Sequence, residues 1–160
     1  MAKRGDAEAA IAPARRAIEL NANFALAYFA LAGALNYAGH HAAAIDAFNM
    51  AQRLSPRDPQ GFMVLSDKAA ALYSLRRYDD AITVAMKARR IRPYGHSLQV
   101  LAASYAQLGR GENMKGALKE MLALPGGTVE ATRWRLEQWS DLAAREHMID
   151  GLRKAGFSAP

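Results

Sequence analysis

Small and apolar residues recur along the chain at spacings of three and four, the period of an α-helix with one buried face. The clearest example is ALAYFALAGALNYAG (25–39), which is followed by HHAAAIDAFNMAQRLSP (40–56). Gly39 separates the two segments, and glycine is the residue that most readily ends a helix in the left-handed conformation. Pro56 closes the second segment because proline cannot continue a helix. The pattern predicts a helix, a tight turn, a second helix and a stop.

This unit is repeated along the chain. The segment 5–23 superposes on 39–57 with an offset of 34 residues, and 76–94 follows with an offset of 37. A weaker copy covers 109–127. The residues that coincide in the first two copies are Gly5 with Gly39, Ala10 with Ala44, Ile11 with Ile45 and Ala17 with Ala51. A fixed period of this length is typical of a helical repeat array, in which each unit buries its apolar face against its neighbours.

The repeats resemble the tetratricopeptide repeat (TPR). The positions that match best are Tyr28, Leu31, Ala32, Leu35, Gly39, Ala44, Phe48, Ala51 and Pro56. Five positions depart from the family pattern: Lys68 replaces a leucine, Arg76 the turn glycine, Ala85 an aromatic residue, and Met114 and Met121 replace alanines of the third repeat. The resemblance implies an all-α fold, a right-handed superhelix of antiparallel helix pairs.

The repeats divide the chain into five parts. We expect a half repeat at 1–23, full repeats at 24–58 and 59–94, a degenerate repeat at 95–125, and two capping helices at 126–160. Ser140 or Asp141 should open the last helix and Gly156 should close it. The apolar cover of the cap is expected from Val129, Trp134, Leu136, Trp139, Leu142, Ile149 and Leu152. Both tryptophans are therefore predicted to pack.

The adjacent residues His40 and His41 are the first candidates for a metal or catalytic site. They lie at the turn, and the other two histidines are His96 and His147, in different repeats. Metal sites need three or four converging ligands, and the chain has no cysteine. No phosphate loop, nucleophile elbow or His-Glu-x-x-His motif is present. We therefore expect solvated turn residues, no metal or cofactor, and no enzyme.

Charge and composition narrow the partners without naming one. The formal net charge is +6, and Lys87, Arg89, Arg90 and Arg92 form a basic cluster late in a predicted second helix. We expect this cluster to lie on a solvated outer face, where cations favour the helix C-terminus. Nucleic-acid binding stays open as an alternative, although no aromatic residues are interleaved with the arginines. The chain shows no signal peptide and no apolar run long enough to span a membrane, so a cytoplasmic location is expected.

The resemblance to TPR proteins implies a concave groove lined by the first helix of each pair. Carried over position by position, the expected partner-binding residues are Phe29, Asn36, Tyr37, Met63, Ser66, Tyr73, His96, Gln99 and Gln107. Such a neutral lining, rich in aromatic and amide groups, suits a peptide or a partner helix. Phe29, Gly33 and Val100 stand where a carboxylate clamp would need cations, so an acidic C-terminus is not the expected ligand.

A narrower resemblance covers LSPRDPQGF (54–62), RRYDDAI (76–82), LAASYAQLGR (101–110), MLALPGG (121–127) and GLRKAG (151–156). These segments are similar to the C-terminal repeats of bacterial adenylate/guanylate cyclases and of winged-helix regulators. The resemblance implies a protein-interaction module of a signalling protein. The alternatives are a basic nucleic-acid-binding module and a regulatory fragment of a cyclase.

The first predicted helix, Ala7–Leu20, lacks the helix that would pair with it in a complete repeat. Its stripe of Ala10, Ala14 and Ala17, with Ile11 and Ile18 beside it, should be partly uncovered. Exposed apolar patches of several hundred Å² tend to be interfaces. We therefore expect either further repeats upstream or self-association through this end.

Overall fold

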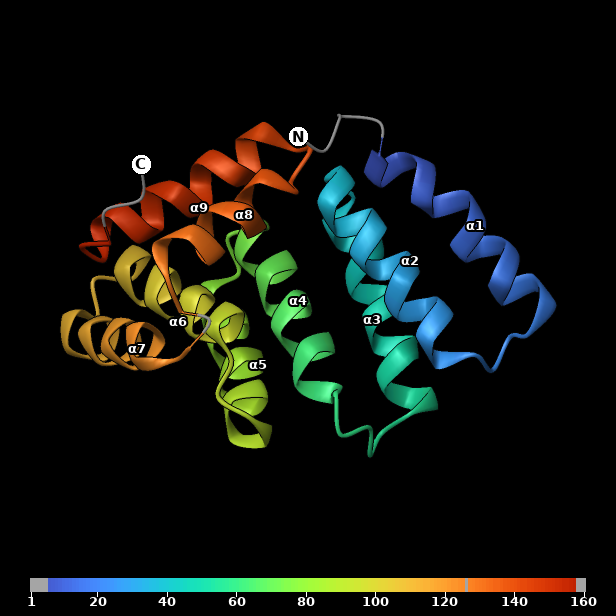
Figure 1. Cartoon of the computed structure of the whole chain (residues 1–160), viewed down its shortest axis with the longest axis horizontal. Coiled ribbons are helices and arrows are strands. Elements are labelled where there is room, and N and C mark those ends of the chain that lie inside the picture. The colour runs from blue at the N-terminus through green and yellow to red at the C-terminus, as the bar shows by residue number, and fades with distance from the viewer. Residues whose placement is uncertain (1–5, 126, 158–160) are drawn as a thin grey trace.

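The computed structural model describes residues 6–125 and 127–157, which form nine α-helices and no β-strand (Figure 1). The all-α prediction is confirmed. The helices are α1 (Asp6–Leu20), α2 (Ala25–Ala38), α3 (His41–Leu54), α4 (Gly61–Ser74), α5 (Tyr78–Ile91), α6 (Gly95–Gln107), α7 (Gly111–Ala123), α8 (Val129–Glu137) and α9 (Leu142–Lys154).

Consecutive helices pack as pairs, and the pairs stack. Helix α2 packs on α3, α4 on α5 and α6 on α7, while α3 contacts α4 and α5 contacts α6. Helix α1 packs on α2 at the end of the stack. The first helices α2, α4 and α6 form one face of the array, which we call the first-helix face; α4 contacts both α2 and α6 directly.

The turn inside each pair has the same backbone conformation. Gly39 has φ 95°, Arg76 has φ 60° and Gly109 has φ 67°, all in the left-handed region. After each turn, a backbone N–H reaches five residues back along the chain, as in His40 N to Leu35 O at 2.8 Å and Arg77 N to Leu72 O at 2.9 Å. Arg76 therefore adopts the glycine conformation because its place in the repeat requires it.

Alanines set the distance between the helices. Ala32 of α2 and Ala44 of α3 have no exposed surface, and Ala51 is also buried. Phe48 is fully buried and shares a cluster with Val64 of α4. As the sequence predicted, the small residues let the two helices of a pair approach closely while Phe48 fills the space towards the next pair.

The last two helices lie across the first-helix face. Helix α9 packs on α6 and α4, and α8 packs on α6. Figure 1 shows α9, in red, crossing these helices towards the end of α2, where the Ser140 N–H donates to Tyr37 O at 2.9 Å. Asp141 caps α9 by accepting from the N–H groups of Ala143 and Ala144 at 3.0 and 3.1 Å.

The prediction that both tryptophans pack is wrong for Trp134. Trp139 is 4% exposed, but Trp134 is 63% exposed and Leu142 is 54% exposed. Helix α8 buries Thr132 and Leu136 against the repeats. Trp134 is midway between these two residues in the sequence, which places it on the opposite side of the helix. It therefore faces away from the array.

The prediction that His41 is a solvated turn residue is also wrong. Its ring is buried, with Nδ1 2.7 Å from Asn36 Oδ1 and Nε2 3.3 Å from Asp141 Oδ2. Nδ1–H donates to the amide oxygen of Asn36, and the Asp141 carboxylate lies beside the other ring nitrogen. His40, in contrast, is exposed and lies 2.9 Å from Glu8 Oε1. His41 thus joins the first turn of the array to the start of α9, which no local pattern reveals.

A second histidine attaches the middle of α9. The ring of His147 stacks on Tyr73 with centroids 4.7 Å apart, and its Nε2 lies 3.0 Å from the Tyr78 hydroxyl. Burial lowers the pKa of His147, and the charge of Arg76 lowers it further. Burial also lowers the pKa of His41, and the hydrogen bond to Asp141 opposes this shift only in part.

Replacing Arg76 by glycine should stabilise the fold. A non-glycine residue in the left-handed region costs about 1–2 kcal/mol, and the flexibility of glycine in the unfolded chain offsets about 0.4–1 kcal/mol of the gain. Urea denaturation should therefore show the free energy of unfolding raised by roughly 0.5–1 kcal/mol. Arg76→Ala is the control, since it removes the same charge and keeps the strain. Equal stability of the two variants would contradict this explanation of the turn.

Stability should fall as the pH is lowered from about 6.5 to 5. The folded-state pKa values of His41 and His147 lie below the ordinary value, so the unfolded chain binds more protons in this range. The two neutral histidines contribute fully to the free energy of unfolding above their unfolded pKa. As the pH falls below that value, the contribution of each decreases by up to about 1.4 kcal/mol per pH unit. Urea midpoints followed by circular dichroism would measure it. The double variant His41→Gln, His147→Gln should flatten the profile, and a wild-type midpoint that holds or rises on acidification would contradict the assignment.

Candidate interaction site

The nine residues predicted to bind a partner all lie on the first-helix face. Helix α2 carries Phe29, Asn36 and Tyr37; α4 carries Met63, Ser66 and Tyr73; and α6 carries His96, Gln99 and Gln107. Asn36, Ser66, Tyr73, His96 and Gln99 are at most 4% exposed, and the other four are half-buried. As a partner site the set stays a prediction, but the side chains of Tyr73, Gln99 and Gln107 already contact α8 or α9.

Tyr73 is the centre of these contacts. Its hydroxyl donates to His147 O at 2.9 Å and accepts from the Gln107 side-chain amide at 3.1 Å. The same amide group also donates to Asp150 of α9 at 3.1 Å. Burial raises the pKa of Tyr73, so the phenol stays neutral and keeps its proton for His147. Three elements, α4, α6 and α9, therefore meet at one hydroxyl.

Gly151 of α9 lies directly against this tyrosine. A Cβ atom built on Gly151 would overlap the Tyr73 hydroxyl and would lie 3.0 Å from the Ala103 Cβ of α6. Glycine destabilises a helix interior relative to alanine, so its place in the middle of α9 needs a packing reason. The reason is that α9 comes within backbone contact of the first-helix face.

Helix α8 supplies an arginine to the middle of the same face. Arg135 Nε donates to Gln99 Oε1 at 3.2 Å. Burial lowers the pKa of this guanidinium, while Tyr94, Tyr37 and Asp67 raise it. Asp67 itself accepts from His96 Nδ1 at 3.0 Å. These groups form a polar row under α8, in which the buried charge of Arg135 is compensated by amide, phenol and carboxylate groups.

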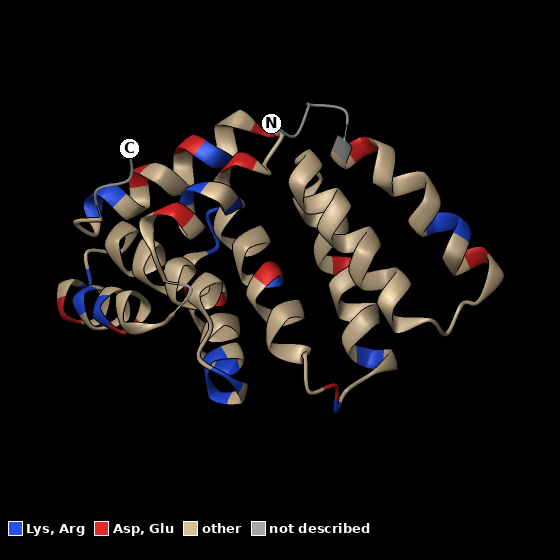
Figure 2. Cartoon of the chain, in the orientation of Figure 1, with Lys and Arg blue, Asp and Glu red and all other residues tan. Residues whose placement is uncertain are grey.

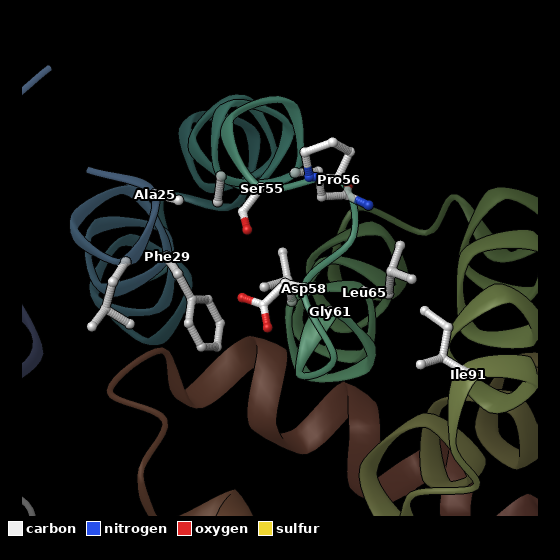
Figure 3. A pocket seen from close by; sticks show the side chains of 12 residues that line it. Ala25, Phe29, Ser55, Pro56, Asp58, Gly61, Leu65 and Ile91 are labelled. Carbon is white, nitrogen blue, oxygen red and sulfur yellow. The ribbon is translucent and has the colours of Figure 1, made fainter. Parts of the chain in front are cut away.

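An apolar pocket lies between the start of α2, the end of α3 and the start of α4 (Figure 3). Tyr37, which contacts Ser140, is at the opposite end of α2. We call this pocket the end pocket; it encloses about 230 Å³. Its lining includes Leu26, Phe29, Val64, Leu65 and Ile91 together with the carboxylate of Asp58. Figure 3 shows Phe29 and Asp58 pointing into it.

The rim of the end pocket is exposed. Leu26 is 61% exposed and Ile91 is 53% exposed, whereas Val64 and Leu65 at its floor are buried. Large exposed aliphatic side chains beside a hollow are typical of a contact surface. The predicted site included Phe29 but neither Leu26 nor Ile91, because the helical period alone does not show which apolar residues lie beside a pocket.

Charges are sparse on this side of the molecule. Helix α2 has no charged residue, as Figure 2 shows. In the basic cluster, Arg89 forms an ion pair with Glu120 of α7 at 2.6 Å and Arg92 lies 5.4 Å from the ring centre of Phe62. Lys87 and Arg90 are exposed at the surface of α5. Two of the four cations are thus engaged in contacts between helices.

Within residues 6–125 and 127–157, no group of three or more His, Asp or Glu side chains could hold a metal ion. No helix there is long and apolar enough to cross a membrane. The side chains that do converge, around Tyr73 and around Arg135, are bonded to one another across helices and act as packing contacts.

Comparison with known proteins gives the fold. No family model and no curated protein matches the chain. A crystal structure of MamA is similar, with 16% identity and a TM-score of 0.69 over 95% of this chain and 88% of that one. The structure of the MamA RS-1 ArsTM double mutant is also similar, with 18% identity and a TM-score of 0.68 over 96% of this chain and 85% of that one.

A third similar structure is that of TTC0263, a thermophilic TPR protein of Thermus thermophilus. It is 25% identical, with a TM-score of 0.63 over 96% of this chain and 86% of that chain. The predicted architecture is confirmed: the described residues form an all-α superhelix of TPR type.

Proposed function

We propose that this chain is a non-catalytic protein-interaction scaffold that binds a peptide or a partner helix on its first-helix face. The end pocket is the observation that carries the proposal. Its apolar rim is exposed, and α2, which forms one wall of the pocket, has no charged residue. An apolar side chain of a partner would remove Leu26, Phe29 and Ile91 from water together, which is how anchor residues act in peptide grooves.

The partner would extend from the end pocket along α2. Phe29, Gly33 and Tyr37 follow at intervals of four residues and share one side of that helix. A Cβ added to Gly33 would meet nothing within 4 Å, so no part of the described chain fills the space in front of it. A ligand backbone could approach closely there.

The wider context of the proposal rests on the sequence resemblance alone. We place the module in the cytoplasm, as part of a bacterial signalling or regulatory protein similar to cyclases or winged-helix regulators. Self-association through α1 belongs to the same proposal. Ala14 is buried against the array, while Ala10 is exposed and Leu20 is 73% exposed, so one apolar edge of α1 is available to a neighbour.

Selection from a displayed peptide library on the immobilised chain would test the binding site. Leu26→Asp and Ile91→Asp should each weaken the selected ligands by about 30-fold, the effect of losing an anchor worth about 2 kcal/mol. Both side chains are exposed in the free chain, so these changes should leave the fold intact.

Leu122→Asp on α7 is the matched control, because Leu122 is 52% exposed and lies outside the end pocket. Its affinity for the same peptides should equal that of the wild type. If all three variants bind alike, the end pocket is not the site. If no peptide is selected at all, the scaffold proposal fails.

A further inference from the structure

The contact between Gly151 and Tyr73 defines the kind of helix that the first-helix face accepts. Tyr73 is fully buried, and Ala103 beside it has no exposed surface either. Any side chain at position 151 would overlap the tyrosine hydroxyl. A helix can therefore lie here only if it presents a glycine at this point.

The rest of α9 fits the face through a short apolar stripe. Ala144, Met148, Leu152 and Ala155 are buried at intervals of four, four and three residues and flank Gly151 on the same side. These side chains belong to one continuous cluster with α4, α5, α6 and α7. If α9 left, apolar surface of the repeats would be exposed to water, which is unfavourable. Exchange of α9 for a similar helix keeps this surface covered and avoids that cost.

Two polar contacts of this segment come from its carboxylates. Asp141 contacts His41 near the end of α2, and Asp150 accepts from Gln107 of α6. A competing helix would make the same contacts with an acidic residue at each position. The pattern required of it is an apolar stripe with one acidic residue at its start, a second acidic residue nine positions later and a glycine directly after that.

We propose that α9 is an internal ligand of the first-helix face, and that the partner of this chain is a helix of the same pattern which displaces α9. This inference rests on the proposed function and adds to it the class of partner and the regulation of the site. In the free chain, α9 occupies the surface that the partner would contact. The partner therefore binds only as α9 is released.

The test uses the full chain with Gly151→Val, which should force α9 off Tyr73. Gly116→Val is the matched control, since Gly116 lies inside α7, is exposed and would meet nothing within 4 Å of an added Cβ. Both variants carry Trp134→Phe, which leaves Trp139 as the single tryptophan. Release of α9 should expose Trp139, which is 4% exposed, and shift its emission to longer wavelength.

The probe is a labelled synthetic peptide of residues 140–157. It should bind the Gly151→Val chain roughly 30-fold more tightly than the wild type or the Gly116→Val chain, the usual effect of opening or blocking one anchor site. The same peptide carrying Gly151→Val should bind none of them. Equal binding to all chains, or a folded Gly151→Val chain with unchanged Trp139 emission, would overturn the inference.

A second variant covers the case in which circular dichroism shows the Gly151→Val chain to be unfolded. Asp141→Ala with Asp150→Ala removes both carboxylate attachments and keeps every apolar contact, and it should still bind the peptide more tightly than the wild type. Failure of this folded variant to do so would overturn the inference. Concentration-dependent dimers of the wild type that exchange α9 between copies would also overturn it, because the occupant would then be a second copy.

The library peptides separate this inference from the proposed function. If they bind at the end pocket without changing the Trp139 emission, the scaffold function stands and the exchange of α9 is wrong. If they shift the emission and carry Gly at the position that aligns with Gly151, both are supported.

Discussion

Close approach of helices is the constraint on which the rest of this structure depends. Ten alanines of the repeats have no exposed surface: Ala32, Ala44, Ala69, Ala70, Ala71, Ala81, Ala85, Ala88, Ala102 and Ala103. A buried alanine removes little apolar area from water, so the stability it provides comes from the contacts that its small size allows between neighbouring backbones. Helix α9 follows the same rule with a still smaller residue, Gly151, at its closest point.

The repeat architecture could be predicted from the sequence because its signals are local. Gly39, Pro56 and the alanines around them fix where helices end and which sides meet, and Arg76 follows the same backbone in spite of its side chain. The position of α8 and α9 could not be predicted in this way. An apolar stripe shows that a helix is covered but does not say by what, and both the end of the stack and the first-helix face could have covered it.

The errors at His41 and Trp134 have the same origin. His41 is adjacent to an exposed histidine in the sequence, and its burial comes from Asp141, one hundred residues away. Trp134 lies in a short helix whose buried side is set by Leu136 and Thr132, so its size and hydrophobicity say nothing about its direction. The nine predicted partner residues lie on α2, α4 and α6, and the structure shows Tyr73, Gln99 and Gln107 among them bonded to α8 or α9.

Docking of α9 requires this short segment to become helical, which lowers its conformational entropy. At thirteen residues, it is below the length at which an isolated helix is stable in water. Its N-terminal cap, Asp141, also contributes to docking, so helix formation and docking are coupled. Detached from Tyr73, the segment would lose its helical order and gain conformational entropy. A rival that is already helical pays no such ordering cost when it binds, and this saving offsets part of the translational and rotational freedom that a separate molecule loses and the tethered α9 does not.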